Sequence, residues 1–279
     1  MNLTKYGIWT TYRSLGRENA AGAARLVEQL GFGTFWLGGS AEPEQLRPLL
    51  EATGGLVAAT GITNIWASEP GPVAEQAAAL AAGFPGRALI GIGAGHREHT
   101  AEYGRPLTAM RAFLDGLDAA PAPLPESGRV LAALGPKMLE LSAARATGAH
   151  PYFTPVEHTR FARGHLGSGP LLAPELACAI DDDRDRARAA ARAYASSYLA
   201  LRNYTGNLLR FGFTEADLRD GGSDRLIDAV VPSGSADHVA ELVQAHLEAG
   251  ADHVCLQPVG VAGVPRAQWT ALAAALGTS

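Results

Sequence analysis

Short runs of branched and aromatic residues alternate along this chain with alanine-rich stretches whose apolar positions have a helical spacing. Eight of these runs are predicted to be strands, and each is followed by at least one predicted helix. The strands are expected at Lys5–Tyr12, Thr34–Leu37, Ile62–Ala67, Arg87–Ile92, Val130–Leu134, His150–Phe153, Glu175–Ile180 and Asp252–Gln257. The helices are expected at Asn19–Leu30, Pro43–Thr53, Pro72–Ala82, Pro106–Leu117, Lys137–Thr147, Pro155–His165, Asp183–Leu201, Ala236–Glu248 and Pro265–Leu276. Such an alternation is typical of a parallel sheet covered by helices.

Eight strands and their helices in 279 residues fit an α/β fold of the (β/α)8 TIM-barrel type, whose usual length is about 250 residues. We therefore expect residues 1–279 to form a single barrel domain. A doubly wound open sheet is the main alternative. Its dinucleotide-binding fingerprint is absent, because the third glycine of the run Gly91–His96 is out of register.

Composition excludes several classes of protein. Hydrophobic residues make up 47% of the chain and charged residues 18%, which is typical of a globular protein with a sizeable core. The net charge of −5 argues against nucleic-acid binding, which needs clustered positive charge. No apolar run reaches the length of a membrane span. The N-terminal residues lack the apolar stretch of a signal peptide, and Cys178 and Cys255 resemble buried thiols, so we expect a cytoplasmic protein.

The carboxyl ends of the predicted strands are where a barrel enzyme carries its chemistry. In this chain those ends are rich in aromatic residues and glycine and poor in charge. The segments are Trp9–Tyr12, Trp36–Ser40, Gly61–Trp66, Gly91–His99, Ala133–Met138, His150–Phe153 and Gln257–Pro258. Such a lining indicates a pocket for a flat, largely apolar ring system, with a small organic molecule as substrate.

Signals for metal and nucleophile chemistry are weak. His96 and His99 are three residues apart, but nothing in the sequence implies a third ligand, so no metal site is predicted. The run Leu134–Lys137 is more informative, because glycine followed by proline at a helix start leaves backbone N–H groups free for an anion. We expect the N–H groups of Lys137 and Met138 to point at the pocket as a phosphate site. An ordinary β-to-α turn would have the same sequence.

Many stretches, in order along the chain, resemble the luciferase-like monooxygenase superfamily and, within it, the actinobacterial branch that uses the deazaflavin coenzyme F-420. The matching stretches are Gly61–Asn64, Gly91–His96, Tyr103–Asp115, Ala133–Leu141, Gly148–Phe153, Glu157–Thr159, Tyr198–Tyr204, Ser223–Ala229 and Gly250–Cys255. The resemblance implies a bacterial-luciferase-like barrel with an extra segment between strands seven and eight, at about Asp183–Ala249. It also implies coenzyme F-420 across the barrel mouth and, as the family often shows, a homodimer.

The resemblance also implies roles for particular residues. The coenzyme's phosphate tail would be held by Gly135, Pro136, Lys137 and Met138. The ring would be backed by Gly61, Ile62 and Asn64, with a cis peptide bond between Gly61 and Ile62, and flanked by Gly95 and His96. His96 and His150 would be the catalytic residues, since an imidazole can donate or accept a proton beside a hydride transfer. Tyr198 and Tyr204 are interpreted as core or wall residues.

One departure from the resemblance affects the predicted reaction. Related dehydrogenases often end strand two with an Asp-His pair that handles the substrate proton, whereas this chain has Gly39 and Ser40. Three functions therefore stay open: hydride transfer between coenzyme F-420 and a small organic substrate, FMN-dependent monooxygenation, and coenzyme binding without catalysis. The uncharged pocket wall favours a neutral or apolar substrate.

Overall fold

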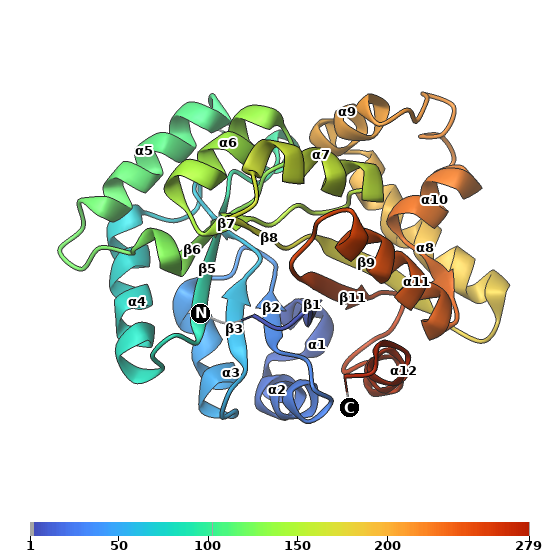
Figure 1. Ribbon diagram of the computed structural model, residues 1–279, viewed down its shortest axis with the longest axis horizontal. Coiled ribbons are helices and arrows are strands. Elements are labelled where there is room, and N and C mark those ends of the chain that lie inside the picture. Colours follow the sequence, from blue (N-terminus) through green and yellow to red (C-terminus); the bar gives the residue numbers. More distant parts are fainter. Residues whose placement is uncertain (1–2, 102, 279) are drawn as a thin grey trace.

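A computed structural model of the chain describes residues 3–101 and 103–278, and its strands lie at the centre of the molecule (Figure 1). The strands are β1 (Tyr6–Thr10), β2 (Thr34–Leu37), β3 (Val57–Thr60), β4 (Thr63–Asn64), β5 (Ala88–Gly93), β6 (Arg129–Leu131), β7 (Gly148–Ala149), β8 (Leu171–Leu172), β9 (Glu175–Ile180), β10 (Ser233–Gly234) and β11 (Val254–Pro258). They are hydrogen-bonded in the order β10-β9-β11-β1-β2-β3-β5-β6-β7-β8, with β4 beside β5, and every pairing is parallel.

The two ends of this sheet are joined by one continuous segment. β8 pairs with β7, β9 pairs with β11, and only Ala173 and Pro174 separate β8 from β9. Backbone hydrogen bonds continue across the junction, from Ala173 N–H to the Ala149 carbonyl and from Glu175 N–H to the Pro151 carbonyl, both at 2.9 Å. The strands therefore form a barrel, and their carboxyl ends all lie at the same end of it.

The helices lie around the strands (Figure 1). They are α1 (Tyr12–Leu15), α2 (Ala20–Gln29), α3 (Arg47–Glu51), α4 (Pro70–Gly83), α5 (Pro106–Asp118), α6 (Pro136–Arg145), α7 (Val156–Leu166), α8 (Arg184–Leu199), α9 (Arg202–Arg210), α10 (Asp224–Val230), α11 (Ala236–Glu248) and α12 (Arg266–Leu276). Local chemistry explains where several helices start. Proline occupies the first turn of α4, α5 and α6. At the first turns of α8, α10 and α11, backbone N–H groups donate hydrogen bonds to the side chains of Asp183, Ser223 and Ser235, respectively.

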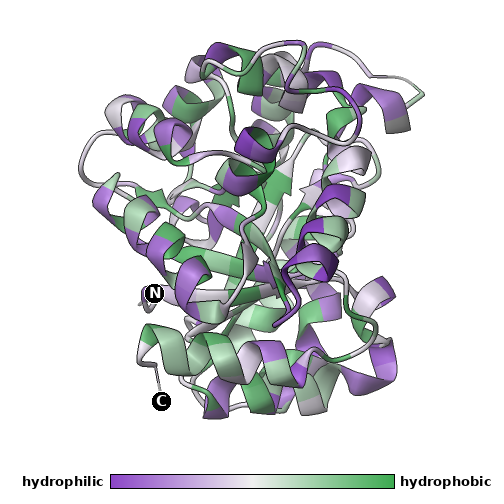
Figure 2. Ribbon diagram, turned by 90° about the vertical axis from the view of Figure 1, so that its right-hand side faces the viewer, coloured by the Kyte–Doolittle hydropathy of each residue, from purple (hydrophilic) through white to green (hydrophobic). Residues whose placement is uncertain are grey.

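The core lies between the strands and the inner faces of the helices. The strands are mainly apolar, whereas the helices carry both apolar and polar positions (Figure 2). A second apolar cluster, which includes Phe153, Ala191, Leu208 and Leu226, joins the helices α8–α10 to the carboxyl end of the barrel. These helices therefore form part of the wall above the strand ends.

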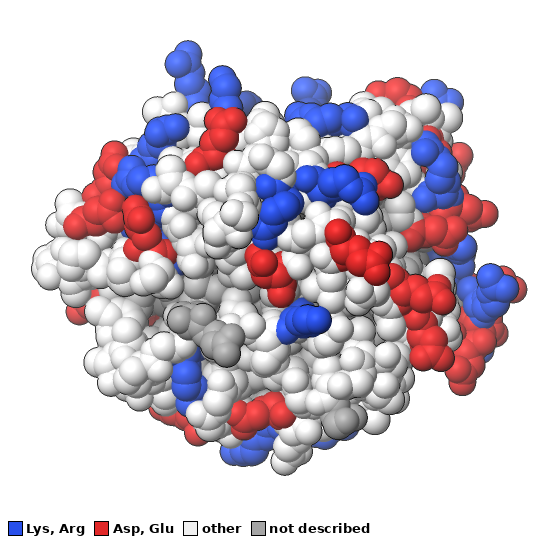
Figure 3. Space-filling model, viewed as in Figure 1, with Lys and Arg blue, Asp and Glu red and all other residues white. Residues whose placement is uncertain are grey.

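Basic and acidic side chains are interspersed on the face of the molecule shown in Figure 3. Within the described residues, no helix combines the length and the apolarity needed to cross a lipid bilayer. Cys178 and Cys255 are buried free thiols, as the sequence predicts.

The predicted (β/α)8 barrel is confirmed, and two of its strands need correction. The third barrel strand is Val57–Thr60, and only Thr63–Asn64 of the predicted Ile62–Ala67 is a strand, the short β4 beside β5; the sixth strand is Gly148–Ala149 and not His150–Phe153. Both observed strands consist mainly of alanine, glycine and valine, so tertiary pairing overrides a weak local preference for β structure. The seventh strand, Glu175–Ile180, has the predicted bounds, and the predicted extra segment after it contains α8, α9, α10, β10 and α11.

Glu175 lies where the barrel closes and is almost fully buried, at 1% exposure. Its Oε2 accepts a hydrogen bond from the Phe153 N–H at 3.2 Å. Burial without a compensating positive charge raises the pKa of this carboxyl to about 8. The side chain is therefore neutral in the folded protein at pH 7.

This burial predicts a pH-dependent effect of Glu175→Gln. Between pH 4.5 and 8 the folded protein holds a proton on Glu175 that the unfolded chain releases, so raising the pH favours unfolding. Glutamine cannot release a proton. The stability of the wild type relative to Glu175→Gln should fall by up to about 1.4 kcal/mol per pH unit across this range, measured by urea unfolding at a series of pH values. A difference that does not change with pH would contradict the buried neutral carboxyl.

Candidate active site

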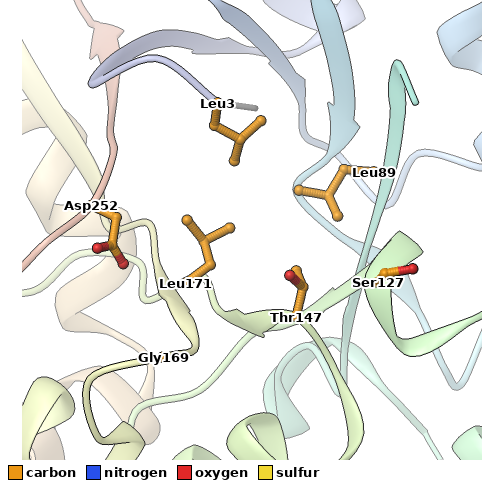
Figure 4. Close-up of a pocket in the computed structure, with 7 residues that line it drawn as sticks. All are labelled: Leu3, Leu89, Ser127, Thr147, Gly169, Leu171 and Asp252. Atoms are coloured by element: carbon orange, nitrogen blue, oxygen red, sulfur yellow. The ribbon is translucent and has the colours of Figure 1, made fainter. Parts of the chain in front are cut away.

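Two hollows lie at opposite ends of the barrel. The smaller, about 260 Å³, is lined by residues that begin or precede strands, among them Leu89, Thr147, Leu171 and Asp252 (Figure 4). The larger, about 420 Å³, is lined by residues that end or follow strands β1 to β7 and by residues of α8 and α9. Because barrel enzymes carry their chemistry at the carboxyl ends of strands, the larger cavity is the candidate site.

The walls of the larger cavity are aromatic, small or amide-bearing. None of the described lining residues is Asp, Glu, Lys or Arg. Its lining includes Trp9, Tyr103, Tyr152 and Tyr204, together with glycines from several strand ends. A cavity of this composition suits a flat ring system whose reactive part is uncharged.

The connection between β3 and β4 forms one wall. The Gly61–Ile62 peptide bond is cis, which confirms the geometry that the family resemblance implies. Gly61, Ile62 and Asn64 all line the cavity. A Cβ on Gly61 would lie 2.5 Å from Trp9 Nε1 and 3.3 Å from His150 Nε2, so this position requires glycine.

His150 follows β7 and is 1% exposed. Its Nδ1 lies 2.7 Å from the Ala173 carbonyl oxygen, and its ring stacks on Trp36 with centroids 4.3 Å apart. A carbonyl oxygen only accepts hydrogen bonds, so Nδ1 carries the proton and Nε2, which reaches the cavity, is an acceptor. Burial lowers the pKa of His150 to about 4. His150 is therefore a neutral acceptor at pH 7.

His96 also lines the cavity and follows β5. Gly95 before it has a positive φ of 56°, a conformation that favours glycine. The His96 Nδ1 is 3.1 Å from Asn203 Oδ1, and its ring centroid is 5.1 Å from that of Tyr204. His96 thus connects the end of β5 to α9 across the cavity wall.

The start of α6 is only partly as predicted. Gly135 and Met138 line the cavity, whereas Pro136 and Lys137 do not, and Lys137 is exposed. The Met138 N–H donates to the Gly135 carbonyl at 3.1 Å, so the prediction that this N–H is free is wrong. The Lys137 N–H has no hydrogen-bond partner within the described part of the chain. The helix therefore offers fewer free donors than its sequence suggested.

A cluster of tyrosines, with Tyr152 and Tyr198 in the cavity lining, forms one wall of the site. The Tyr152 hydroxyl is 2.6 Å from that of Tyr194 and 2.9 Å from that of Tyr198, and it donates to Gln257 Oε1 at 2.8 Å. Burial raises the pKa of Tyr152, Tyr194 and Tyr198, so these hydroxyls stay neutral. Tyr198 and Tyr204 are wall residues, as expected, but no sequence spacing indicated that Tyr152 and Tyr194 would meet them.

Comparison with protein families agrees with this geometry. The sequence profile of luciferase-like monooxygenases matches residues 3–253. The chain belongs to this family. No curated protein sequence matches the chain significantly.

Several solved structures of luciferase-like proteins have the same fold at low sequence identity. An F-420-dependent secondary alcohol dehydrogenase, in complex with an F-420–acetone adduct, superposes with a TM-score of 0.77 at 16% identity over 99% of both chains. The coenzyme F-420-dependent tetrahydromethanopterin reductase from Methanopyrus kandleri gives 0.73 at 17% identity over 98% of both chains. The oxygenating constituent of 3,6-diketocamphane monooxygenase from Pseudomonas putida, in complex with FMN, gives 0.71 at 15% identity, covering 98% of this chain and 96% of that one.

The buried environment of His150 predicts its titration. The folded-state pKa of about 4 lies below the ordinary histidine value of 6.5, so between these values the unfolded chain binds more protons and acidification favours unfolding. NMR of the imidazole should show His150 neutral from pH 8 down to about 5. A midpoint near 6.5 in the folded protein would contradict the assignment of Nε2 as a neutral acceptor.

Proposed function

We propose that this chain is an oxidoreductase that transfers a hydride between coenzyme F-420 and a small, uncharged organic substrate. The observation that supports this most strongly is the uncharged, aromatic cavity at the carboxyl ends of the barrel strands. The F-420-dependent alcohol dehydrogenase and reductase described above have the same fold, which makes this coenzyme the first candidate.

The residues present fit a flat coenzyme. Gly61, Ile62 and Asn64 would lie behind its ring, and Gly95 and His96 would flank it. The position of a Cβ on Gly135 is open space, which leaves room for a phosphate group at the start of α6. The tail would extend past Gly135–Met138 toward the exposed side chain of Lys137.

When bound, the coenzyme would supply a carbon that accepts or donates a hydride. The protein would supply positioning and proton handling. His150 would hold a substrate or ring hydrogen through its Nε2, and His96, which is less buried, would exchange the substrate proton with solvent. The tyrosine cluster would exclude water from the other wall. In this assignment His96 and His150 are the catalytic residues.

FMN-dependent monooxygenation is the second candidate. It is favoured by the structural likeness to the diketocamphane monooxygenase constituent in complex with FMN. The start of α6 could hold the phosphate of FMN as well as that of F-420. A barrel that binds coenzyme without turnover is the third candidate. Gly39 and Ser40 line the cavity at the position where related dehydrogenases often have an acid–base pair, and the lack of such a pair is compatible with binding alone.

Titration of the purified protein with F-420 and, separately, with FMN distinguishes these functions. The proposal predicts saturable quenching of F-420 fluorescence and redox turnover of the bound coenzyme with at least one neutral alcohol, carbonyl or alkene in a substrate panel. Tight FMN binding without F-420 binding would contradict it. F-420 binding without turnover on any substrate of the panel would favour the non-catalytic barrel.

The assigned phosphate site predicts that Gly135→Asp weakens coenzyme binding by at least about tenfold, since a carboxylate there repels the phosphate. Gly135→Asn is the matched control, because it has almost the same shape without the charge. Gly135 is the N-cap of α6 in an extended conformation, and both Asp and Asn are favoured at N-caps, so neither variant should destabilise the fold. Equal affinity of the two variants would exclude this phosphate site.

A further inference from the structure

Trp9 presents an unsatisfied hydrogen-bond donor to the cavity. The side chain lies at the end of β1, with the residue 5% exposed, and its indole fits against two glycines. A Cβ on Gly38 would lie 2.1 Å from the indole Cη2, and one on Gly61 would lie 2.5 Å from Nε1. The Nε1–H has no hydrogen-bond partner among the described residues. Buried indole N–H groups usually have a partner.

His150 presents an unsatisfied acceptor beside it. Its Nδ1 is engaged with the Ala173 carbonyl, its ring is held by stacking on Trp36, and its Nε2 has no partner in the described structure. Trp9 Nε1 and His150 Nε2 lie 2.5 Å and 3.3 Å from the same point, the Cβ position on Gly61. The two nitrogens are therefore close enough for one ligand group to contact both.

Two other buried groups show that a missing partner is not by itself a sign of binding. Trp269 Nε1 and His246 Nε2 also lack partners within the described chain, but neither residue lines the cavity. Trp9 and His150 differ because both residues line the cavity and their unsatisfied nitrogens lie against the same glycine, Gly61. The pair also has complementary chemistry, with one donor and one acceptor.

We propose that Trp9 and His150 form an uncharged donor–acceptor pair that binds a neutral oxygen-bearing group, such as a hydroxyl, or a carbonyl next to an N–H. The oxygen accepts from Trp9 Nε1–H, and a hydrogen of the ligand is donated to His150 Nε2. A carboxylate is disfavoured, because it has no hydrogen for Nε2 and its charge would be buried without a counter-ion. The inference shares one assumption with the proposed function, namely that a coenzyme and a substrate bind in this cavity.

The matching chemistry could come from the coenzyme ring or from the substrate. NMR of protein labelled with 15N at tryptophan records one signal for each indole N–H group. The signal that is missing in the Trp9→Phe variant belongs to Trp9 and reports directly on this donor. A shift on adding F-420 alone would identify the coenzyme ring as the ligand. A shift only when cyclohexanol is added to the F-420-loaded protein would identify the substrate.

Variants test the same pair by affinity. Trp9→Phe removes the N–H, and His150→Asn removes the acceptor while its amide can still donate to the Ala173 carbonyl. Each should weaken binding of the probe that shifts the indole signal by about five- to tenfold, the usual effect of one neutral hydrogen bond. Trp269→Phe and His246→Asn, which remove unpartnered buried nitrogens away from the cavity, are the matched controls and should leave binding unchanged.

Three results would overturn the inference: an indole signal that moves with none of these probes, equal weakening by the control variants, or binding of cyclohexanecarboxylate as tight as that of cyclohexanol. These results are distinct from failure of the proposed function. If neither F-420 nor FMN binds, the proposed function fails, whereas a Trp9 shift with cyclohexanol alone would still support the donor–acceptor pair.

Discussion

The segment Leu171–Ile180 is hydrogen-bonded to β7 on one side and to β11 on the other, and the rest of the structure depends on this double pairing. It brings all the strand ends around one cavity. It also fixes the site directly, because the Ala173 carbonyl accepts the His150 Nδ1–H and the Glu175 side chain accepts the Phe153 N–H. The pairing that closes the barrel therefore also determines which nitrogen of His150 faces the cavity.

Much of the fold could be predicted from the sequence, because apolar periodicity and glycine or proline boundaries are local signals. They located the seventh strand, whereas the extra segment after it was implied by the family resemblance. They failed at Val57–Thr60 and Gly148–Ala149, where alanine and glycine carry little preference for β structure and only pairing with neighbouring strands decides. The neighbouring runs after Gly61 and from His150 have stronger β-forming residues, but apart from the two-residue strand β4 they form loops that line the cavity.

The site was predictable where a residue lies shortly after a strand end. Gly61, Gly95, His96, Gly135 and His150 all follow the end of a strand within a few residues and line the cavity. Tertiary contacts set the rest. The hydroxyl cluster of Tyr152, Tyr194 and Tyr198 forms between residues up to 46 positions apart, and the unsatisfied nitrogen of Trp9 depends on two distant glycines. Backbone hydrogen bonding, which the sequence does not reveal, likewise occupies the Met138 N–H.

We propose that the uncharged cavity at the strand ends receives a flat coenzyme, with neutral groups at its wall and the start of α6 at its rim. A crystal structure of the protein with saturating F-420 tests this most directly. We predict the deazaflavin ring against Gly61–Ile62, within hydrogen-bond reach of no charged side chain, and the phosphate at Gly135. A coenzyme bound elsewhere, or a ring held by a charged residue, would contradict the account.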